Sequence, residues 1–197
     1  MEKKDLKPAG VFKYFEEICQ VPRPSKKEEK MIAYLKAFGA KHNLETKVDE
    51  AGNVLIKKPA TPGKENLQTV VLQSHIDMVC EKNNDVQHDF LTDPIETEID
   101  GEWLKAKGTT LGADNGIGVA TELAILADDS IEHGPLECLF TVDEETGLTG
   151  AFALKEGFMS GDILLNLDSE DEGEIFIGCA GGCLLYTSPS PRDLSTS

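Results

Sequence analysis

Three short apolar runs in this chain each end next to a residue that can bind a metal ion. The runs span residues 69–74, 136–142 and 163–167. Short stretches rich in apolar and β-branched residues are typical of strands buried on both faces, as in the centre of an α/β sheet. Because such strands need helices to cover them, these runs constrain the fold more than any other feature of the sequence.

Helices and hairpins are predicted around these runs. Apolar residues recur at helical spacing in three segments, and two pairs of short strands flank turn signals. We expect helices at residues 11–19, 26–40 and 117–126, and hairpins pairing 45–48 with 53–57 and 95–99 with 103–106. Ser25 is expected to cap the second helix. The alternation predicts an α/β fold, a mixed sheet flanked by helices, in one domain or two.

Six side chains that can carry chemistry are expected at one edge of this sheet. They are His75, Asp77, Asp114, Glu144, Glu145 and Asp168. All but one of them stand at or just beyond the end of a predicted strand, and the remaining one opens a helix. Ligands of open α/β sheets bind at this edge, and one imidazole with several carboxylates suits zinc, cobalt or manganese. The sequence therefore predicts a metal site.

The spacing of His75 and Asp77 predicts that the aspartate supports the histidine. Residues two apart on an extended strand face the same side. A carboxylate that accepts the second ring N–H fixes the tautomer and makes the imidazole a better ligand. The alternative is a histidine that is merely hydrogen-bonded at a strand end. For Asp114, the alternative is an ordinary helix cap.

Three consecutive acids, Asp143, Glu144 and Glu145, directly follow an apolar strand. Their mutual repulsion raises the pKa of such groups unless cations are nearby. One glutamate can bind a metal ion while its neighbour, left free, takes a proton from water. A solvated charged turn is the alternative.

Two other patterns are excluded by their spacing. Residues 112–118 combine glycines with a helix start, but they lack the lysine and the glycine order of nucleotide-binding loops. Residues 168–173 resemble the start of an EF-hand calcium loop, but the twelfth position is Cys179 where that loop needs a glutamate. Only Asp168 is kept from this segment as a ligand candidate.

The charge of the chain argues against two classes of partner. Asp and Glu outnumber Lys and Arg by 36 to 19, which gives a net charge of -17. This charge repels phosphate backbones and anionic headgroups, so neither nucleic acid nor a membrane is an expected partner. No stretch approaches the ~20 apolar residues of a membrane span. The 5 cysteines form no CxxC pair, which fits a reducing compartment, and we expect a cytoplasmic protein.

Four longer motifs carry a family resemblance. They are LQSHIDMVCEKNND, KGTTLGADNGIG, FTVDEETG and NLDSEDEGEIFIGCAGG, in this order. With them the chain resembles the carnosinase-like family of dinuclear zinc peptidases, and within it the bacterial aminoacyl-histidine dipeptidases, as far as Gly182. The resemblance implies a zinc-peptidase catalytic domain that hydrolyses Xaa-His and other unblocked dipeptides.

The resemblance also implies the metal ligands. His75 and Asp168 hold one zinc ion. Glu145 helps to hold a second, and Asp114 bridges the two. The implied cofactors are two Zn²⁺, with Co²⁺ or Mn²⁺ as alternatives.

The proton chemistry is implied in the same way. Glu144 is the general base that activates water and later protonates the leaving amine, and Asp77 orients His75. The family has a cis peptide bond after its bridging aspartate. This predicts a cis bond between Asp114 and Asn115.

The resemblance is incomplete towards the C-terminus. The family has a further zinc-binding histidine and an inserted lid domain, which binds the substrate carboxylate and mediates dimerisation, and this sequence contains neither. We expect residues 1–182 to be the N-terminal part of the catalytic domain and residues 183–197 to be a non-native, disordered tail. The parent protein is expected to be a homodimeric dipeptidase, and the 197-residue chain to be inactive. An N-acyl-amino-acid amidohydrolase and a non-catalytic metal-binding fragment are the alternatives.

Overall fold

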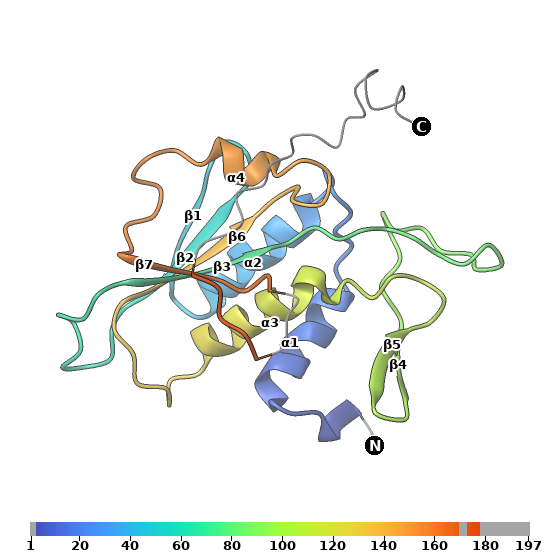
Figure 1. Ribbon diagram of the computed structural model, residues 1–197, viewed down its shortest axis with the longest axis horizontal. Coiled ribbons are helices and arrows are strands. Elements are labelled where there is room, and N and C mark those ends of the chain that lie inside the picture. The colour runs from blue at the N-terminus through green and yellow to red at the C-terminus, as the bar shows by residue number, and fades with distance from the viewer. Residues whose placement is uncertain (1–2, 170–172, 178–197) are drawn as a thin grey trace, which may run out of the picture.

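The computed structural model describes residues 3–169 and 173–177 (Figure 1). Its helices are η1 (Lys3–Asp5), α1 (Ala9–Cys19), α2 (Glu29–Lys41), α3 (Ala113–Ala127) and α4 (Thr149–Ala153). Its strands are β1 (Glu45–Val48), β2 (Val54–Lys58), β3 (Val70–His75), β4 (Thr97–Asp100), β5 (Trp103–Ala106), β6 (Leu136–Thr141) and β7 (Ile163–Asn166). No helix in this part of the chain is long and apolar enough to cross a membrane.

The main sheet is mixed, as the sequence predicts. Its strand order is β1-β2-β6-β3-β7, and β4 and β5 form a separate two-stranded sheet. Strand β2 is antiparallel to both β1 and β6, whereas β3 is parallel to both β6 and β7. The register places His75 beside Thr141, so β3 and β6 end at the same edge of the sheet.

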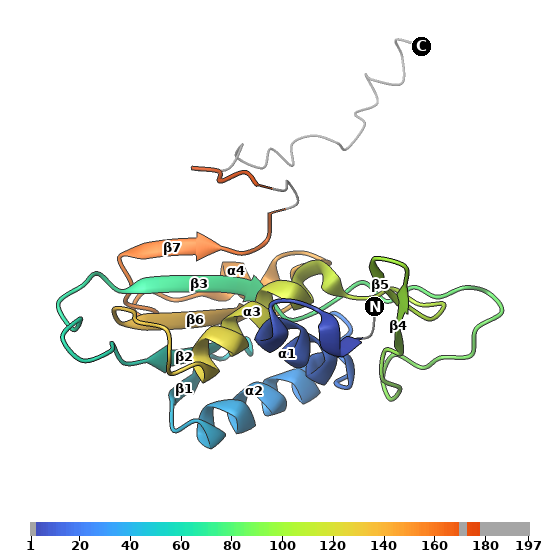
Figure 2. The same cartoon turned by 90° about the horizontal axis from the view of Figure 1, so that it is seen from below.

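Helices α1, α2 and α3 lie together on one face of the sheet (Figure 2). Each forms because its apolar residues recur on one side, such as Met31, Leu35 and Phe38 of α2, all of which are buried. The main core joins these helices to β2, β3 and β6. Each large apolar side chain buried there contributes ~1.5–3 kcal/mol. The opposite face carries a smaller cluster around Leu55 and Leu139, covered by residues that follow α4.

The predicted elements are confirmed, with shifts at their ends. Both hairpins form. The range of α3 starts at Ala113, but Asp114 and Asn115 have non-helical backbone angles, so the regular helix begins after Asn115, close to the expected residue 117. The start and cap of the second helix are wrong: α2 begins at Glu29, because Lys26 adopts a left-handed backbone with φ 67°. Ser25 does not cap it and instead donates to Asp77. The elements η1 and α4 are too short to show a period. The tail predicted at 183–197 lies outside the described residues.

Candidate metal centre

His75 is the last residue of β3, and its side chain is only 1% exposed. Its Nδ1 lies 3.2 Å from Oδ1 of Asp77, and its Nε2 lies 3.0 Å from Oδ1 of Asp114. Because an ionised carboxylate can only accept, Nδ1–H of a neutral His75 is assigned as the donor to the buried Asp77. The lone pair of Nε2 then faces the exposed side of the site, as a metal ligand requires.

The carboxylate of Asp77 is fully buried and accepts hydrogen bonds from three further donors. The hydroxyl of Ser25 donates to Oδ2 at 2.7 Å, and the backbone N–H groups of Glu144 and Glu145 donate at 3.0 and 3.2 Å. Burial alone raises the pKa of Asp77, but the hydrogen bonds from His75, from Glu144 and from Ser25 outweigh it and lower this pKa to about 2. Asp77 is therefore ionised, and it links the histidine to the loop that carries both glutamates.

Asp114 stands at the start of α3 and points towards His75. The N-cap position belongs to Gly112, whose φ of 68° is a left-handed conformation that glycine adopts without steric cost. Among the described residues, the side chain of Asp114 is hydrogen-bonded to His75 and to no backbone N–H of α3, so the helix-cap alternative is wrong. The peptide bond between Asp114 and Asn115 is cis, as the resemblance predicts.

Asp168 follows β7 and reaches the same edge of the sheet, since β7 pairs in parallel with β3. One of its oxygens lies 3.8 Å from Nε2 of His75. The buried amide of Asn115 donates to this carboxylate at 2.6 Å and to the carbonyl of Leu167 at 2.9 Å. Asn115 thus holds Asp168 at the site from the residue next to Asp114.

Glu144 and Glu145 lie on the loop that follows β6. An oxygen of Glu144 lies 3.9 Å from Nε2 of His75. The preceding Asp143 is buried and accepts hydrogen bonds from the hydroxyls of Thr146 in the same loop and of Thr149 at the start of α4. Asp143 therefore shapes the loop, and the two glutamates face the site.

A buried asparagine anchors this loop. The side chain of Asn53 donates to the carbonyl of Gly150 at 2.8 Å and accepts the N–H of Val142 at 3.1 Å. We expect Asn53→Ala to lower the free energy of unfolding by about 2–3 kcal/mol, because each unsatisfied buried group costs about 1–3 kcal/mol. Urea denaturation followed by circular dichroism measures this, with the exposed Asn84→Ala as control. Equal losses in both variants would contradict the anchoring role.

The electrostatics of the site favour a bound cation. Burial lowers the pKa of His75, but the hydrogen bond to Asp77 and the charge of Asp168 raise it to about 9. Burial raises the pKa of Glu144 and of Glu145, and neighbouring carboxylates raise both further. Burial also raises the pKa of Asp168, against the hydrogen bond from Asn115. A divalent ion would offset this repulsion and favour the charged forms.

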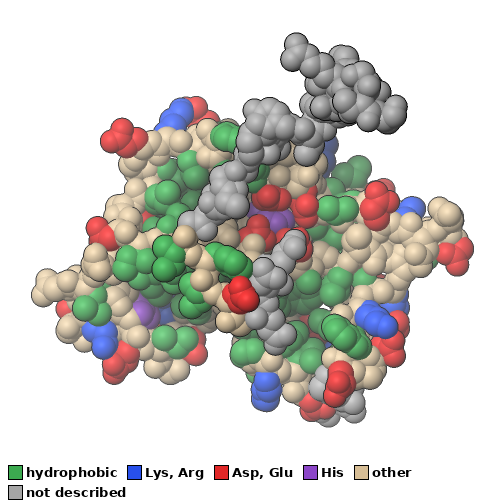
Figure 3. Space-filling view, in the orientation of Figure 1, with side chains coloured by type: hydrophobic (Ala, Val, Ile, Leu, Met, Phe, Trp, Pro, Cys, Tyr) green, Lys and Arg blue, Asp and Glu red, His purple; other side chains and the backbone are tan. Residues whose placement is uncertain are grey.

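Two overlapping groups of side chains fit a metal ion. The first is His75 with Asp114 and Asp168, and the second is His75 with Glu144 and Glu145; in each, the ligand atoms lie within 4.8 Å of one another. Imidazole and carboxylate donors suit zinc, cobalt or manganese. Figure 3 shows acidic side chains gathered around a histidine on this face, so the donor set is both compact and accessible.

A third acidic group, Glu28 with Asp77 and Asp143, does not suggest a metal. All three side chains are buried. Their oxygens already accept hydrogen bonds; Glu28, for example, accepts the N–H groups of Lys26 and Asp143 at 3.0 and 2.9 Å. This group therefore supports the loops around the site.

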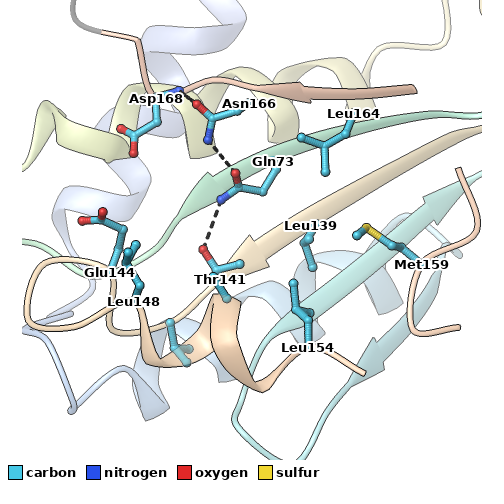
Figure 4. A pocket seen from close by; sticks show the side chains of 12 residues that line it. Gln73, Leu139, Thr141, Glu144, Leu148, Leu154, Met159, Leu164, Asn166 and Asp168 are labelled. Carbon is cyan, nitrogen blue, oxygen red and sulfur yellow. Dashed lines mark hydrogen bonds between the residues drawn. The ribbon is translucent and has the colours of Figure 1, made fainter. Parts of the chain in front are cut away.

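A cleft of about 350 Å³ adjoins the site on the sheet face opposite α1 (Figure 4). Glu144 and Asp168 stand at one end of it, and its lining is otherwise uncharged. The apolar part is formed by side chains that include Leu139, Leu148, Leu154, Met159 and Leu164. A polar row crosses it, in which the Asn166 amide donates to Gln73 at 2.6 Å and the Gln73 amide donates to Thr141 at 3.2 Å. The carboxylates thus border an apolar space.

The other five side chains predicted from the sequence all lie around His75. Three supporting residues were missed: Arg23, Ser25 and Asn115. Arg23 donates to backbone carbonyls on both sides of the site. Its one signal in the sequence is its place between two prolines, which restrict the backbone on either side of it. The sequence signal for Asn115 is that it directly follows the predicted ligand Asp114.

Comparisons with known proteins cover the same residues. The family model of peptidase family M20/M25/M40 matches residues 71–182. The cytosol non-specific dipeptidase of Escherichia coli K12 is 53% identical over 181 residues, which are 92% of this chain and 37% of that protein. The crystal structure of aminoacylhistidine dipeptidase from Vibrio alginolyticus gives a TM-score of 0.88 at 56% identity, covering 91% of this chain and 36% of that one.

A more distant structure, aminopeptidase PepT from Bacillus cereus, gives a TM-score of 0.70 at 26% identity, covering 82% of this chain and 43% of that one. The chain thus spans less than half the length of each of these relatives. The family match includes more than half of the chain and every side chain of the candidate centre. The chain therefore belongs to peptidase family M20/M25/M40.

Proposed function

We propose that the chain is the metal-binding N-terminal part of a dinuclear zinc dipeptidase, which hydrolyses Xaa-His and other unblocked dipeptides. The observation that carries this proposal is the buried His75, with Asp77 behind its Nδ1 and carboxylates around its Nε2. Two relatives that are named as dipeptidases support the substrate class. The uncharged lining of the cleft suits dipeptide side chains of varied shape.

The proposed ligands take all three residues of the first donor group, and only Glu145 is added from the second, because Glu144 is assigned as the base. His75 and Asp168 hold one ion, Glu145 contributes to the second, and Asp114 lies between them. The contacts of His75 with Asp114 and Asp168 support the first part of this assignment. Bound divalent ions supply Lewis-acid activation of water and of the peptide carbonyl.

The proton steps are assigned to Glu144 and Asp77. Glu144 takes a proton from the attacking water as the oxygen adds to the carbonyl carbon, and it delivers that proton to the amine as the C–N bond breaks. Its raised pKa suits a group that must both accept and donate. Asp77 keeps the proton of His75 on Nδ1, so Nε2 stays available as a ligand.

The proposal extends to the whole protein. Residues 1–182 are its N-terminal catalytic part, and it dimerises in the cytoplasm through a lid domain. The purified chain is expected to bind metal without hydrolysing β-alanyl-histidine. Turnover of this dipeptide by the chain would show that the residues present are sufficient for catalysis.

Adjacent glutamates give a matched test of the assigned roles. Glu145→Gln should weaken Co²⁺ binding by at least about 10–100-fold, the loss typical of groups that only support a ligand, because it removes a ligand itself. Glu144→Gln should leave the Co²⁺ affinity within about 3-fold, a change of less than 1 kcal/mol, because the base is not a ligand. Titration of the metal-free chain with Co²⁺, followed by visible absorption, measures both. The opposite order would reverse the two roles, and an unmodified chain that binds no Co²⁺ would refute the proposed function.

A further inference from the structure

Arg23 is a buried cation that metal binding does not itself require. It is 2% exposed and lies between Pro22 and Pro24, in the segment that joins α1 to α2. Removing a guanidinium group from water costs several kcal/mol unless its donors are satisfied. Among the residues that the structure describes, only backbone carbonyls accept its hydrogen bonds. The segments to which those carbonyls belong therefore indicate the structural role of the Arg23 side chain.

The carbonyls belong to the two segments that present His75 and Asp114. Nη1 of Arg23 donates to the carbonyl oxygens of Ile76 and Asp77, both at 3.2 Å, directly after the histidine. Nη2 donates to the carbonyl of Gly112 at 2.6 Å, two residues before Asp114. A planar guanidinium with donors in a fixed fork can hold both segments at once. It thereby ties the end of β3 to the start of α3.

The start of α3 is built closely around this guanidinium. A Cβ atom at Gly112 or at Gly116 would lie 2.6 Å from Nη2, so a side chain at either position would displace Arg23. These two glycines bracket Asp114. The backbone on both sides of the aspartate is therefore packed directly against the cation.

The residues after Arg23 continue the same contact. Pro24 forms a parallel bridge with Met78, and the hydroxyl of Ser25 donates to the carboxylate of Asp77 at 2.7 Å. Three consecutive residues thus run beside the segment that follows β3. Of these three residues, Arg23 also contacts the start of α3, through the hydrogen bond from its guanidinium to Gly112.

We propose that Arg23 is a positioning residue, which fixes the spacing between His75 and Asp114 and so sets the affinity for divalent ions. The inference rests on the proposed function, because it takes these two side chains to be ligands. In the structure Nε2 of His75 and Oδ1 of Asp114 lie 3.0 Å apart, between the two segments that Arg23 joins. A lysine keeps the charge but has no planar fork, so it cannot hold both segments in the same geometry.

The test compares Arg23 with another buried cation. Lys58 is 8% exposed and donates to the carbonyls of Ile125 and Asp128 at the far end of α3. Arg23→Gln, Arg23→Lys and Lys58→Met are made in the complete 197-residue chain. Each is titrated with Co²⁺ while the visible absorption spectrum is recorded, and each is unfolded with urea. The spectrum reports the ligand geometry, which a loss of stability alone does not change.

Arg23→Gln should weaken Co²⁺ binding by about 10–100-fold and alter the visible bands, and Arg23→Lys should weaken it by about 10-fold. Lys58→Met should lose stability while keeping the affinity and the spectrum of the unmodified chain. If Arg23→Gln does not fold, Arg23→Lys alone decides. Unchanged affinity and bands in a folded Arg23 variant would overturn the positioning role and leave the proposed function intact. An unmodified chain that binds no Co²⁺ would overturn both.

Discussion

Without metal, the chain should be less stable at pH 9 than at pH 6.5 by about 3 kcal/mol through His75 alone. The folded-state pKa of His75 is about 9, above its unfolded value of 6.5, because Asp77 and Asp168 favour the imidazolium despite burial. The stability that this shift provides is fully present below pH 6.5 and is lost as the pH rises through about 9. The difference between the folded-state pKa of about 9 and the unfolded value of 6.5 corresponds to about 3 kcal/mol. Urea denaturation in EDTA between these pH values measures the loss.

Zinc should reverse this pH dependence. A histidine must be neutral to bind a metal ion, so the ion competes with the proton and stabilises the chain more at pH 9 than at pH 6.5. His75→Gln should remove most of the metal-free loss. His133→Gln, at the opposite end of β6, should keep it. A flat metal-free profile, or an equally steep one in His75→Gln, would contradict the assignment of His75 as the titrating group.

The candidate site was predictable because its residues stand at the ends of recognisable strands. His75, Glu144 and Asp168 each follow an apolar run that the sequence shows directly. Parallel pairing of β3 with β6 and β7 then brings them to one edge. The contact between His75 and Asp77 was also predictable, because the two residues are only two apart in the sequence at the end of one strand.

The supporting contacts were not predictable in this way. Arg23 reaches Gly112 across 89 residues of sequence, and no local pattern records that pairing. Serine is a residue type that often caps helices, and Ser25 was predicted to do so. Because Lys26 adopts a left-handed backbone, α2 begins only at Glu29, and the hydroxyl of Ser25 donates to Asp77 instead. Local sequence preferences predict whether a segment forms a helix or a strand. Tertiary contacts decide which hydrogen bonds are made by a polar side chain near the end of that helix or strand.

The buried Glu122 opposes the stability of the fold. It lies within α3 with 0% exposure, and neither carboxylate oxygen has a hydrogen-bond partner among the described residues. Burial raises its pKa well above the usual 4.5, and the nearby Ser74 and Cys138 only partly oppose this. The folded state thus holds a proton that the unfolded chain releases above pH 4.5. The cost is absent below pH 4.5 and grows by about 1.4 kcal/mol per pH unit until the folded-state pKa is reached.

Glu122→Gln should therefore stabilise the chain by up to about 3 kcal/mol at pH 7 and by much less at pH 4.5. Glutamine has nearly the same shape and does not ionise, so the pH-dependent part of the cost disappears while the packing is kept. Urea denaturation of both proteins at several pH values measures the difference, with the exposed Glu29→Gln of α2 as the control for net charge. A gain that is the same at both pH values would show that Glu122 stays ionised in the folded chain. Since Glu122 is no ligand in either donor group, Co²⁺ binding should not change, which separates this cost from the chemistry of the site.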